Sequence, residues 1–270
     1  MDTRPPAVAG AFYPSHKQPL LDWLEKLFGD IKDIESSCKG VISPHAGYEY
    51  CGSTAARAVT ALKKFKKLII VGPNHYLRGD DFSIMSRGVW NTPLGDCKIN
   101  PRLAGDIKKS NLVSEDALSH EREHSIEVQI PLLQYRLKSF SFVPISIMNV
   151  DYSPEFLDRC VKLGKTIARI VRKGSVGVIA SSDFSHYLPL STAKQKDKKA
   201  IEKIRQLDIV GLFGALDNMH ASVCGYGPIA VLMSMAKELR LKAKVIHSST
   251  SAEATGDEDS VVSYHAIGFE

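Results

Sequence analysis

The most informative segment of the sequence is Lys67-Leu68-Ile69-Ile70-Val71-Gly72-Pro73-Asn74-His75. Its apolar run is typical of a buried strand, which ends at glycine and proline before a histidine follows. The pattern recurs at residues 40–45 and 175–186, where apolar runs turn polar and soon reach His45 and His186. If the three strands are parallel neighbours, His45, His75 and His186 converge at the carboxyl edge of one sheet, where open α/β sheets bind ligands.

Helical patterns alternate with these strands along the chain. Leu20, Leu24 and Leu27 recur at helical spacing within residues 18–35, and Pro131 weakens or kinks a helix expected at 124–137. Further helices are predicted at 53–62, 101–110, 154–171, 193–207 and 209–216, and another is opened by residues 223–228 and runs to about 241. Further strands are predicted at 82–85, 140–147, 244–247 and 261–269. The alternation predicts an α/β fold, a three-layer sandwich whose largely parallel central sheet is covered by helices on both faces.

Composition and patterning indicate one globular domain. The 270 residues contain 44% hydrophobic and 24% charged residues, which is ordinary for a globular protein. The sequence shows no repeat of fixed period, no low-complexity tract and no linker rich in proline, glycine or serine. We therefore expect residues 1–270 to form a single domain.

Several classes of partner are excluded by the same patterns. No apolar run reaches the roughly 18 residues of a membrane span, and the N-terminus lacks the apolar segment of a secretory signal, so a cytoplasmic protein is expected. The net charge is +5, but the basic runs at 63–67 and 194–199 are typical of solvated helix ends, so nucleic acid is not an expected partner. Five cysteines without paired spacing indicate thiols.

The candidate chemistry depends on a coincidence of residues. One histidine at a strand end is usually a hydrogen-bonded structural residue, but three after comparable strands favour a shared site. Two neutral imidazoles can hold a transition metal that a third, anionic ligand stabilises. Cys224 could supply that ligand, because a thiol just before a helix N-terminus is expected to favour its thiolate. Its alternative role is that of a small buried hydrophobe.

Asp183 and His186 lie three residues apart on one predicted loop. A carboxylate there could orient the imidazole, and the pair could act as acid and base near neutral pH. The alternative is an Asx turn capped by Asp183. The segment Glu123-His124-Ser125-Ile126-Glu127 is interpreted only as the charged first turn of a helix.

An ordered series of motifs resembles the Memo family from near the first residue to the last strand. Any one motif is weak, but the set in this order is specific. The motifs are PAVAGAFYP at 6–14, PHAGYEYCG at 44–52, GPNH at 72–75, HSIE at 124–127, SDFSHY at 182–187 and CGYGP at 224–228.

The resemblance implies a fold similar to class III extradiol ring-cleaving dioxygenases, in which two histidines and a glutamate hold iron(II). His45 and His75 match the metal histidines, and Cys224 stands where those enzymes use the carboxylate. His186 matches their acid/base histidine, and Asp183 lies beside it. A thiolate is softer than a carboxylate and favours copper(I) or tunes iron differently, so dioxygenase activity does not follow directly.

These observations lead to one interpretation and two alternatives. The interpretation is a metal-dependent oxidoreductase that binds iron(II) or copper through His45, His75 and Cys224 and acts on an unknown small substrate, with His186 moving a proton and Asp183 orienting it. One alternative is a non-catalytic module that binds a peptide or small anion in the same crevice without metal. The other is a zinc hydrolase, because two histidines and a cysteine also suit zinc.

Overall fold

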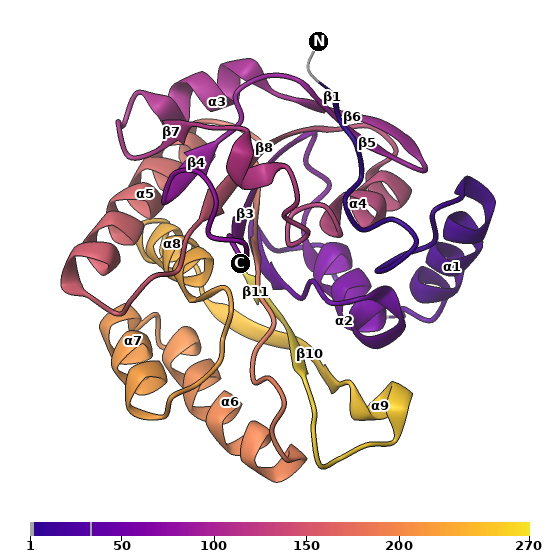
Figure 1. Cartoon of the computed structure of the whole chain (residues 1–270). Helices are drawn as coiled ribbons and strands as arrows, with labels where there is room; N and C mark the ends of the chain where they lie inside the picture. Colours follow the sequence, from indigo (N-terminus) through magenta and orange to yellow (C-terminus); the bar gives the residue numbers. More distant parts are fainter. Residues whose placement is uncertain (1–2, 33) are drawn as a thin grey trace.

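The centre of the sheet consists of β3 (Lys67–Pro73), β9 (Gly177–Ser181) and β2 (Gly40–Ser43). Strand β9 pairs in parallel with β3 on one side and with β2 on the other. The computed structural model describes residues 3–32 and 34–270, and Figure 1 shows the sheet crossing the middle of the molecule. The three strands that lead to His75, His186 and His45 are therefore parallel neighbours, as predicted.

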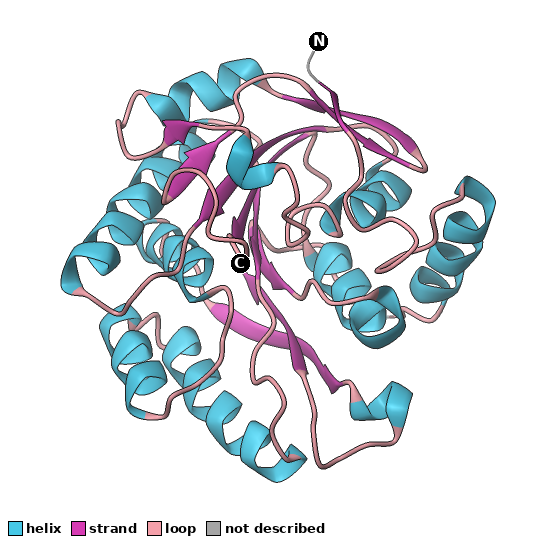
Figure 2. Ribbon diagram, viewed as in Figure 1, coloured by secondary structure: helices cyan, strands magenta, loops and turns pink. Residues whose placement is uncertain are grey.

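Most of the remaining strands extend this centre in both directions, in the order β1-β5-β6-β8-β3-β9-β2-β11-β10, whereas β4 pairs with β8 and β7 pairs with β4 outside this order. The pairs β3–β8 and β6–β8 are parallel, whereas β10–β11 and β11–β2 are antiparallel. The predicted α/β fold with a mostly parallel central sheet is confirmed (Figure 2). The added strands are β1 (Thr3–Arg4), β4 (Phe82–Ile84), β5 (Val89–Thr92), β6 (Gly95–Ile99), β7 (Ser114–Glu115), β8 (Ser141–Ile147), β10 (Ala243–Thr250) and β11 (Ser263–Phe269).

Helices cover both faces of the sheet, because strand side chains alternate between two apolar cores. Ile69 and Val71 of β3 enter one core, whereas Leu68 and Ile70 enter the other. The first core is covered by α3 (Pro101–Lys108), α5 (Pro154–Lys173), α6 (Leu190–Arg205), α7 (Ile209–Asn218) and α8 (Tyr226–Glu238). The second is covered by α1 (Lys17–Gly29), α2 (Tyr48–Ala61) and α4 (Gln129–Leu137).

Two short helical pieces complete the chain, a 3₁₀ turn at Leu118–His120 and α9 at Ala252–Thr255. Within the described residues, none of the helices combines the length and apolarity needed to cross a membrane.

Several predicted boundaries were wrong for local reasons. Helix α1 ends at Gly29, before the predicted residue 35, and position 33 lies outside the described residues. Helix α2 begins at Tyr48, not at Ser53, and the Tyr48 N–H donates to the Phe12 carbonyl. Residues 89–99, for which no strand was predicted, form a hairpin, β5–β6, in which Thr92 pairs with Gly95. The two strands are only four and five residues long, too short for a clear alternation of apolar and polar residues.

Helix α4 begins at Gln129, later than the predicted residue 124. Pro131 therefore lies in its first turn. Backbone N–H groups in the first turn have no acceptor within the helix, so the N–H that proline lacks costs little there. No kink is needed. The segment from His124 to Val128 forms turns instead, and these turns carry residues of the site described below.

Helices α5 and α8 approach closely because α5 has a glycine at the crossing. A Cβ built on Gly164 would lie 2.4 Å from the Val231 carbonyl oxygen and 2.5 Å from the Ser234 Cβ. The contact is with the backbone of α8, which cannot move aside for a Cβ as a flexible side chain could. Gly164 thus sets the spacing of the two helices that cover this face.

We predict that Gly164→Ala lowers the free energy of unfolding by about 1–3 kcal/mol, because overpacking against backbone outweighs the gain in helix propensity. Urea unfolding followed by circular dichroism measures the change. Gly105→Ala in α3 and Gly214→Ala in α7 are matched controls, since a Cβ at either position meets nothing within 4 Å. Both should gain roughly 0.5–1 kcal/mol. A Gly164→Ala protein as stable as these controls would contradict the close crossing.

Candidate metal centre

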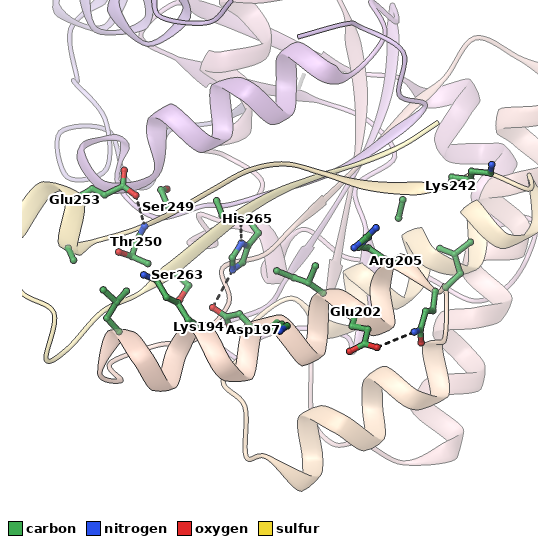
Figure 3. A pocket seen from close by; sticks show the side chains of 18 of the residues that line it. Lys194, Asp197, Glu202, Arg205, Lys242, Ser249, Thr250, Glu253, Ser263 and His265 are labelled. Atoms are coloured by element: carbon green, nitrogen blue, oxygen red, sulfur yellow. Dashed lines mark hydrogen bonds and ion pairs between the residues drawn. The ribbon is translucent and has the colours of Figure 1, made fainter. Parts of the chain in front are cut away.

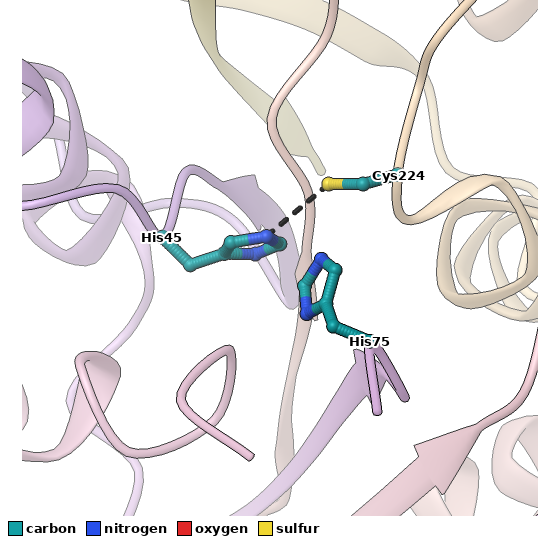
Figure 4. A group of neighbouring side chains, drawn as sticks. All are labelled: His45, His75 and Cys224. Carbon is teal, nitrogen blue, oxygen red and sulfur yellow. Dashed lines mark hydrogen bonds between the residues drawn. The ribbon is translucent and has the colours of Figure 1, made fainter. Parts of the chain in front are cut away.

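Three predicted ligands converge beyond the carboxyl ends of β2 and β3. His45 follows β2, His75 follows β3, and Cys224 precedes α8 (Figure 4). The Sγ of Cys224 lies 3.2 Å from Nε2 of His45, and the two imidazole centroids are 5.1 Å apart. One potential ligand atom from each residue lies within 4.8 Å of the other two. The structure therefore brings together the residues that the sequence pattern selected.

Cys224 reaches this position because the chain before α8 lies against the end of β9. A Cβ on Gly225 would lie 2.4 Å from the Ser181 carbonyl oxygen, so a larger residue would push the segment away. The Gly225 N–H donates to the Ser182 hydroxyl, and the Asp183 N–H donates to the Cys224 sulfur at 3.2 Å. Glycine at position 225 thus allows the close approach that brings Cys224 to the cluster.

The imidazole of His45 is held with one nitrogen directed into the cluster. Its Nδ1 lies 2.9 Å from the Ser181 hydroxyl, and that hydroxyl donates its own hydrogen to the Ser125 carbonyl at 2.6 Å. Ser181 must therefore accept from His45, which places the imidazole proton on Nδ1. Burial, followed by the charges of neighbouring imidazoles, lowers the pKa of His45 well below its ordinary value. The ring is neutral, and its Nε2 lone pair faces Cys224.

The imidazole of His75 is held in the same tautomer by a carboxylate. Its Nδ1 donates to Glu123 Oε1 at 2.9 Å, and its backbone N–H donates to Glu123 Oε2 at 2.7 Å. Glu123 is 1% exposed, and it also accepts from the Ser125 N–H. Burial alone would raise the pKa of Glu123, but the hydrogen bond and charge of His75 outweigh burial and lower the pKa to about 2. The anionic carboxylate leaves Nε2 of His75 free to bind.

A third imidazole joins the cluster, and it belongs to His124. Its ring stacks on His75 with centroids 4.7 Å apart and lies 5.4 Å from His45. Burial lowers the pKa of His124 to about 4, so this ring is also neutral near pH 7. Potential ligand atoms of His75, Glu123 and His124 form a second group within 4.8 Å.

Sequence reasoning missed Glu123 and His124 because it assigned them to a charged first helical turn. The sequence did contain a signal for this segment, because the HSIE motif at 124–127 belongs to the ordered series of motifs. No chemical role was assigned to that motif. The segment packs against the end of β3 because residue 72 is glycine, where a Cβ would lie 2.5 Å from the Ser125 hydroxyl oxygen.

His186 lies on the loop after β9 but is oriented by a residue that was not predicted. Its Nδ1 donates to the Ser222 carbonyl at 2.7 Å, and its N–H donates to the Ser222 hydroxyl at 2.8 Å. The predicted orienting bond from Asp183 is not formed. Asp183 Oδ1 instead accepts the backbone N–H of His45 at 2.8 Å, because the loop turns this carboxylate toward the end of β2. Asp183 supports a candidate ligand, and Ser222 positions His186.

The prediction of a favoured thiolate at Cys224 was also wrong for the metal-free protein. Burial and the nearby Asp183 carboxylate raise the pKa of Cys224 well above its ordinary value. These effects outweigh the positive end of α8. The thiol is therefore protonated near pH 7, and a cation in the cluster would be needed to favour the thiolate.

Comparison with known proteins gives a consistent result. The profile of a family described as "Memo-like protein" matches residues 4–268. The chain is 39% identical to "MEMO1 family protein Mbar_A1422" of Methanosarcina barkeri over 268 residues, with 98% of each chain covered. It is also 39% identical to "MEMO1 family protein TV1383" of Thermoplasma volcanium over 272 residues, covering 98% of this chain and 97% of that protein.

The fold also resembles a solved structure of low sequence identity. This is the crystal structure of uncharacterized protein JW3007 from Escherichia coli K12, with a TM-score of 0.53 and 13% identity. The match covers 84% of this chain and 98% of that chain. At this identity the similarity concerns the fold alone.

We predict that Asp183→Asn stabilises the metal-free protein at about pH 8. Burial raises the pKa of Asp183 from 3.8 to about 6. The folded state thus favours the protonated acid, and stability is lost as pH rises through about 6. A shift of this size corresponds to about 3 kcal/mol at about 1.4 kcal/mol per pKa unit, and asparagine keeps the Oδ1 acceptor for His45.

Urea unfolding at about pH 8 and about pH 4 measures this effect. The gain of Asp183→Asn should shrink toward pH 4, where the wild-type acid is itself protonated in the folded state. Asp217→Asn, at an exposed position of α7, is the matched control and should change stability little at either pH. A variant that is less stable than wild type at about pH 8 would show that the Asp183 charge is favourable where it lies.

Proposed function

Since the chain belongs to the Memo family, we propose that it binds a redox-active metal, iron(II) or copper, through His45, His75 and Cys224. The resemblance recognised in the sequence is confirmed at the level of the family. The metal and the chemistry are the proposal, and the donor geometry supports it. We propose further that the protein is an oxidoreductase that acts on a small substrate.

The observation that carries this proposal is the matched tautomer of two histidines. Both rings have their Nδ1 proton committed to a buried acceptor, Ser181 for His45 and Glu123 for His75. Both Nε2 atoms are left free to bind beside one sulfur. Metal-binding histidines in proteins are typically fixed in this way by hydrogen bonds from the other ring nitrogen.

The donor set favours a transition metal over a hard cation, because imidazole nitrogen and thiolate sulfur are borderline and soft ligands. When bound, an iron or copper ion supplies one-electron chemistry and a positive charge that favours the Cys224 thiolate. The chain supplies the orientation of each donor. The Asp183 carboxylate, which contacts the His45 backbone, adds a negative charge close to the cluster.

His186 is the candidate acid and base for this reaction. Its Nδ1–H is committed to the Ser222 carbonyl, so Nε2 is free to accept or return a proton. The ring lies on the same loop as Asp183, whose carboxylate contacts the backbone of His45. Asp183, with its pKa raised to about 6, is a second group that can exchange a proton near neutral pH.

A binding module without metal is the second candidate, and exposed aromatic residues favour it. Tyr76 and Tyr187 directly follow His75 and His186 and are 49% and 76% exposed. Such side chains could contact a peptide. Metal analysis of protein purified without an affinity tag separates the candidates, because a metal-free protein that binds peptide supports the module. Hydrolysis with zinc and without oxygen dependence would support the third candidate, a zinc hydrolase.

We predict that His45→Ala, His75→Ala and Cys224→Ser each weaken binding of Fe(II) or Cu(I) by at least about 100-fold, since each removes one of three donors. Anaerobic competition titration measures the affinities. His16→Ala is the matched control, because this exposed histidine precedes α1 and, among the described residues, its Nδ1 hydrogen-bonds the neighbouring Ser15 hydroxyl alone. Unchanged affinity in all three site variants would refute the assignment.

We predict a smaller loss, about 10–100-fold, for Glu123→Gln, because the amide no longer fixes the Nδ1–H tautomer of His75. Glu121→Gln is the control, since that carboxylate is 61% exposed and pairs with Arg78 on the surface. Circular dichroism spectra of both variants should match wild type. Equal metal affinity in the two variants would show that Glu123 has a purely structural role.

A further inference from the structure

A serine, a histidine and an aspartate form a second cluster between α6 and the edge strand β10. Ser248 lies on β10, His265 lies opposite it on β11, and Asp197 lies on α6. The Ser248 Oγ is 2.8 Å from His265 Nδ1, and His265 Nε2 is 3.2 Å from Asp197 Oδ2. Figure 3 shows His265 directed toward Asp197 beside the labelled side chains of this region.

The hydrogen bonds determine where each proton lies. Asp197 is 3% exposed, and its Oδ1 accepts from both the N–H and the hydroxyl of Ser185. Its Oδ2 accepts from His265 Nε2, so in the corresponding neutral tautomer Nδ1 is the nitrogen without a proton. In that tautomer the Ser248 hydroxyl donates to Nδ1. A serine proton thus faces a base whose second nitrogen is held by a buried carboxylate.

The cluster opens into a cavity of about 1270 Å³, which Ser248, His265 and Asp197 help to line. Ser248 is exposed there, whereas His265 is 8% exposed, so a reagent can reach the hydroxyl while the base stays largely shielded. Leu190 and Ile201 provide apolar wall. A volume of this size is sufficient for a small organic molecule.

Two further groups at the cavity fit the needs of acyl transfer. Ser263 also lines the cavity, is 1% exposed, and its hydroxyl has no hydrogen-bond partner among the described residues. A buried hydroxyl without a partner is costly, so a ligand oxygen that accepts from it would be favoured. Lys194 lines the same cavity, and its positive charge would stabilise an oxyanion that develops there.

We propose that Ser248 is a nucleophile that accepts the acyl group of small carboxylic esters in this cavity. In the first step the Ser248 Oγ bonds to the ester carbonyl carbon, its proton moves to His265 Nδ1, and the bond to the alkoxy oxygen breaks. His265 returns the proton to the departing alcohol. Water then attacks the acyl-serine, with His265 again taking and returning the proton, and releases the carboxylic acid.

A second pair of serine and histidine, Ser15 and His16, serves as an internal control for the pair Ser248 and His265. Ser15 Oγ lies 3.0 Å from His16 Nδ1, at an exposed position before α1. That pair reproduces the contact between serine and imidazole but has no carboxylate bound to the second ring nitrogen among the described residues. If the carboxylate and the cavity are what activate Ser248, Ser15 should remain inert.

The test is covalent labelling of the full-length protein by a fluorophosphonate probe. In this reaction Oγ bonds to phosphorus, fluoride leaves and the hydroxyl proton goes to His265. Intact mass and peptide mapping should show one adduct, on Ser248. Labelling should be absent in Ser248→Ala, unchanged in Ser15→Ala, and about 100-fold or more slower in His265→Gln, the loss expected for a general base. An ester with a chromogenic leaving group tests turnover in the same variants.

Ser248→Ala changes one exposed hydroxyl and should fold normally, which the thermal unfolding midpoint checks. A chelator separates this site from the candidate metal centre, because labelling of Ser248 should persist when metal is removed. No adduct, an adduct that persists in Ser248→Ala, or equal labelling rates at Ser15 and Ser248 would each overturn the proposal.

Discussion

The hydrogen bond from His75 Nδ1 to the buried carboxylate of Glu123 is the interaction on which the candidate metal centre depends. It joins a strand-end histidine to a segment 48 residues away, and it determines which nitrogen of the ring can bind. Ser181 acts in the same way on His45. Without these two acceptors the imidazoles could exchange tautomers and turn, and the two Nε2 atoms would not be held beside Cys224.

The parallel pairing of β3, β9 and β2 brings His75, Ser181 and His45 to the same edge of the sheet. Because the three strands end at one edge, a loop from each can contribute to one crevice. Glycines at 72 and 225 then let two further segments approach, one with Glu123 and His124 and the other with Cys224. The buried Asp183 carboxylate is a cost of this crowding in the metal-free protein, and a bound cation would favour both this charge and the Cys224 thiolate.

The sequence predicted the sheet centre well because each strand has a strong local signal. The runs at 40–43, 68–71 and 176–180 are apolar, short and bounded by turn residues, and the structure places all three side by side. The predicted ligands His45, His75 and Cys224 are brought together as well. Glu123 and His124 were missed because their partner is distant in the chain, and a charged pair near a helix has a common local explanation. The prediction that Asp183 orients His186 was wrong, because closeness in sequence does not determine the direction of a side chain in a loop. Asp183 accepts from the His45 N–H, and His186 donates to the Ser222 carbonyl.

The most direct test is X-ray absorption of the protein loaded anaerobically with Fe(II) or Cu(I), compared with the Cys224→Ser variant. The proposed centre predicts two imidazole nitrogens at about 2.0 Å and one sulfur at about 2.3 Å from the metal, with the sulfur lost in the variant. A metal without a sulfur neighbour in the wild-type protein would contradict it. So would a metal bound by a carboxylate instead of sulfur, as expected if the ligands were His75, Glu123 and His124.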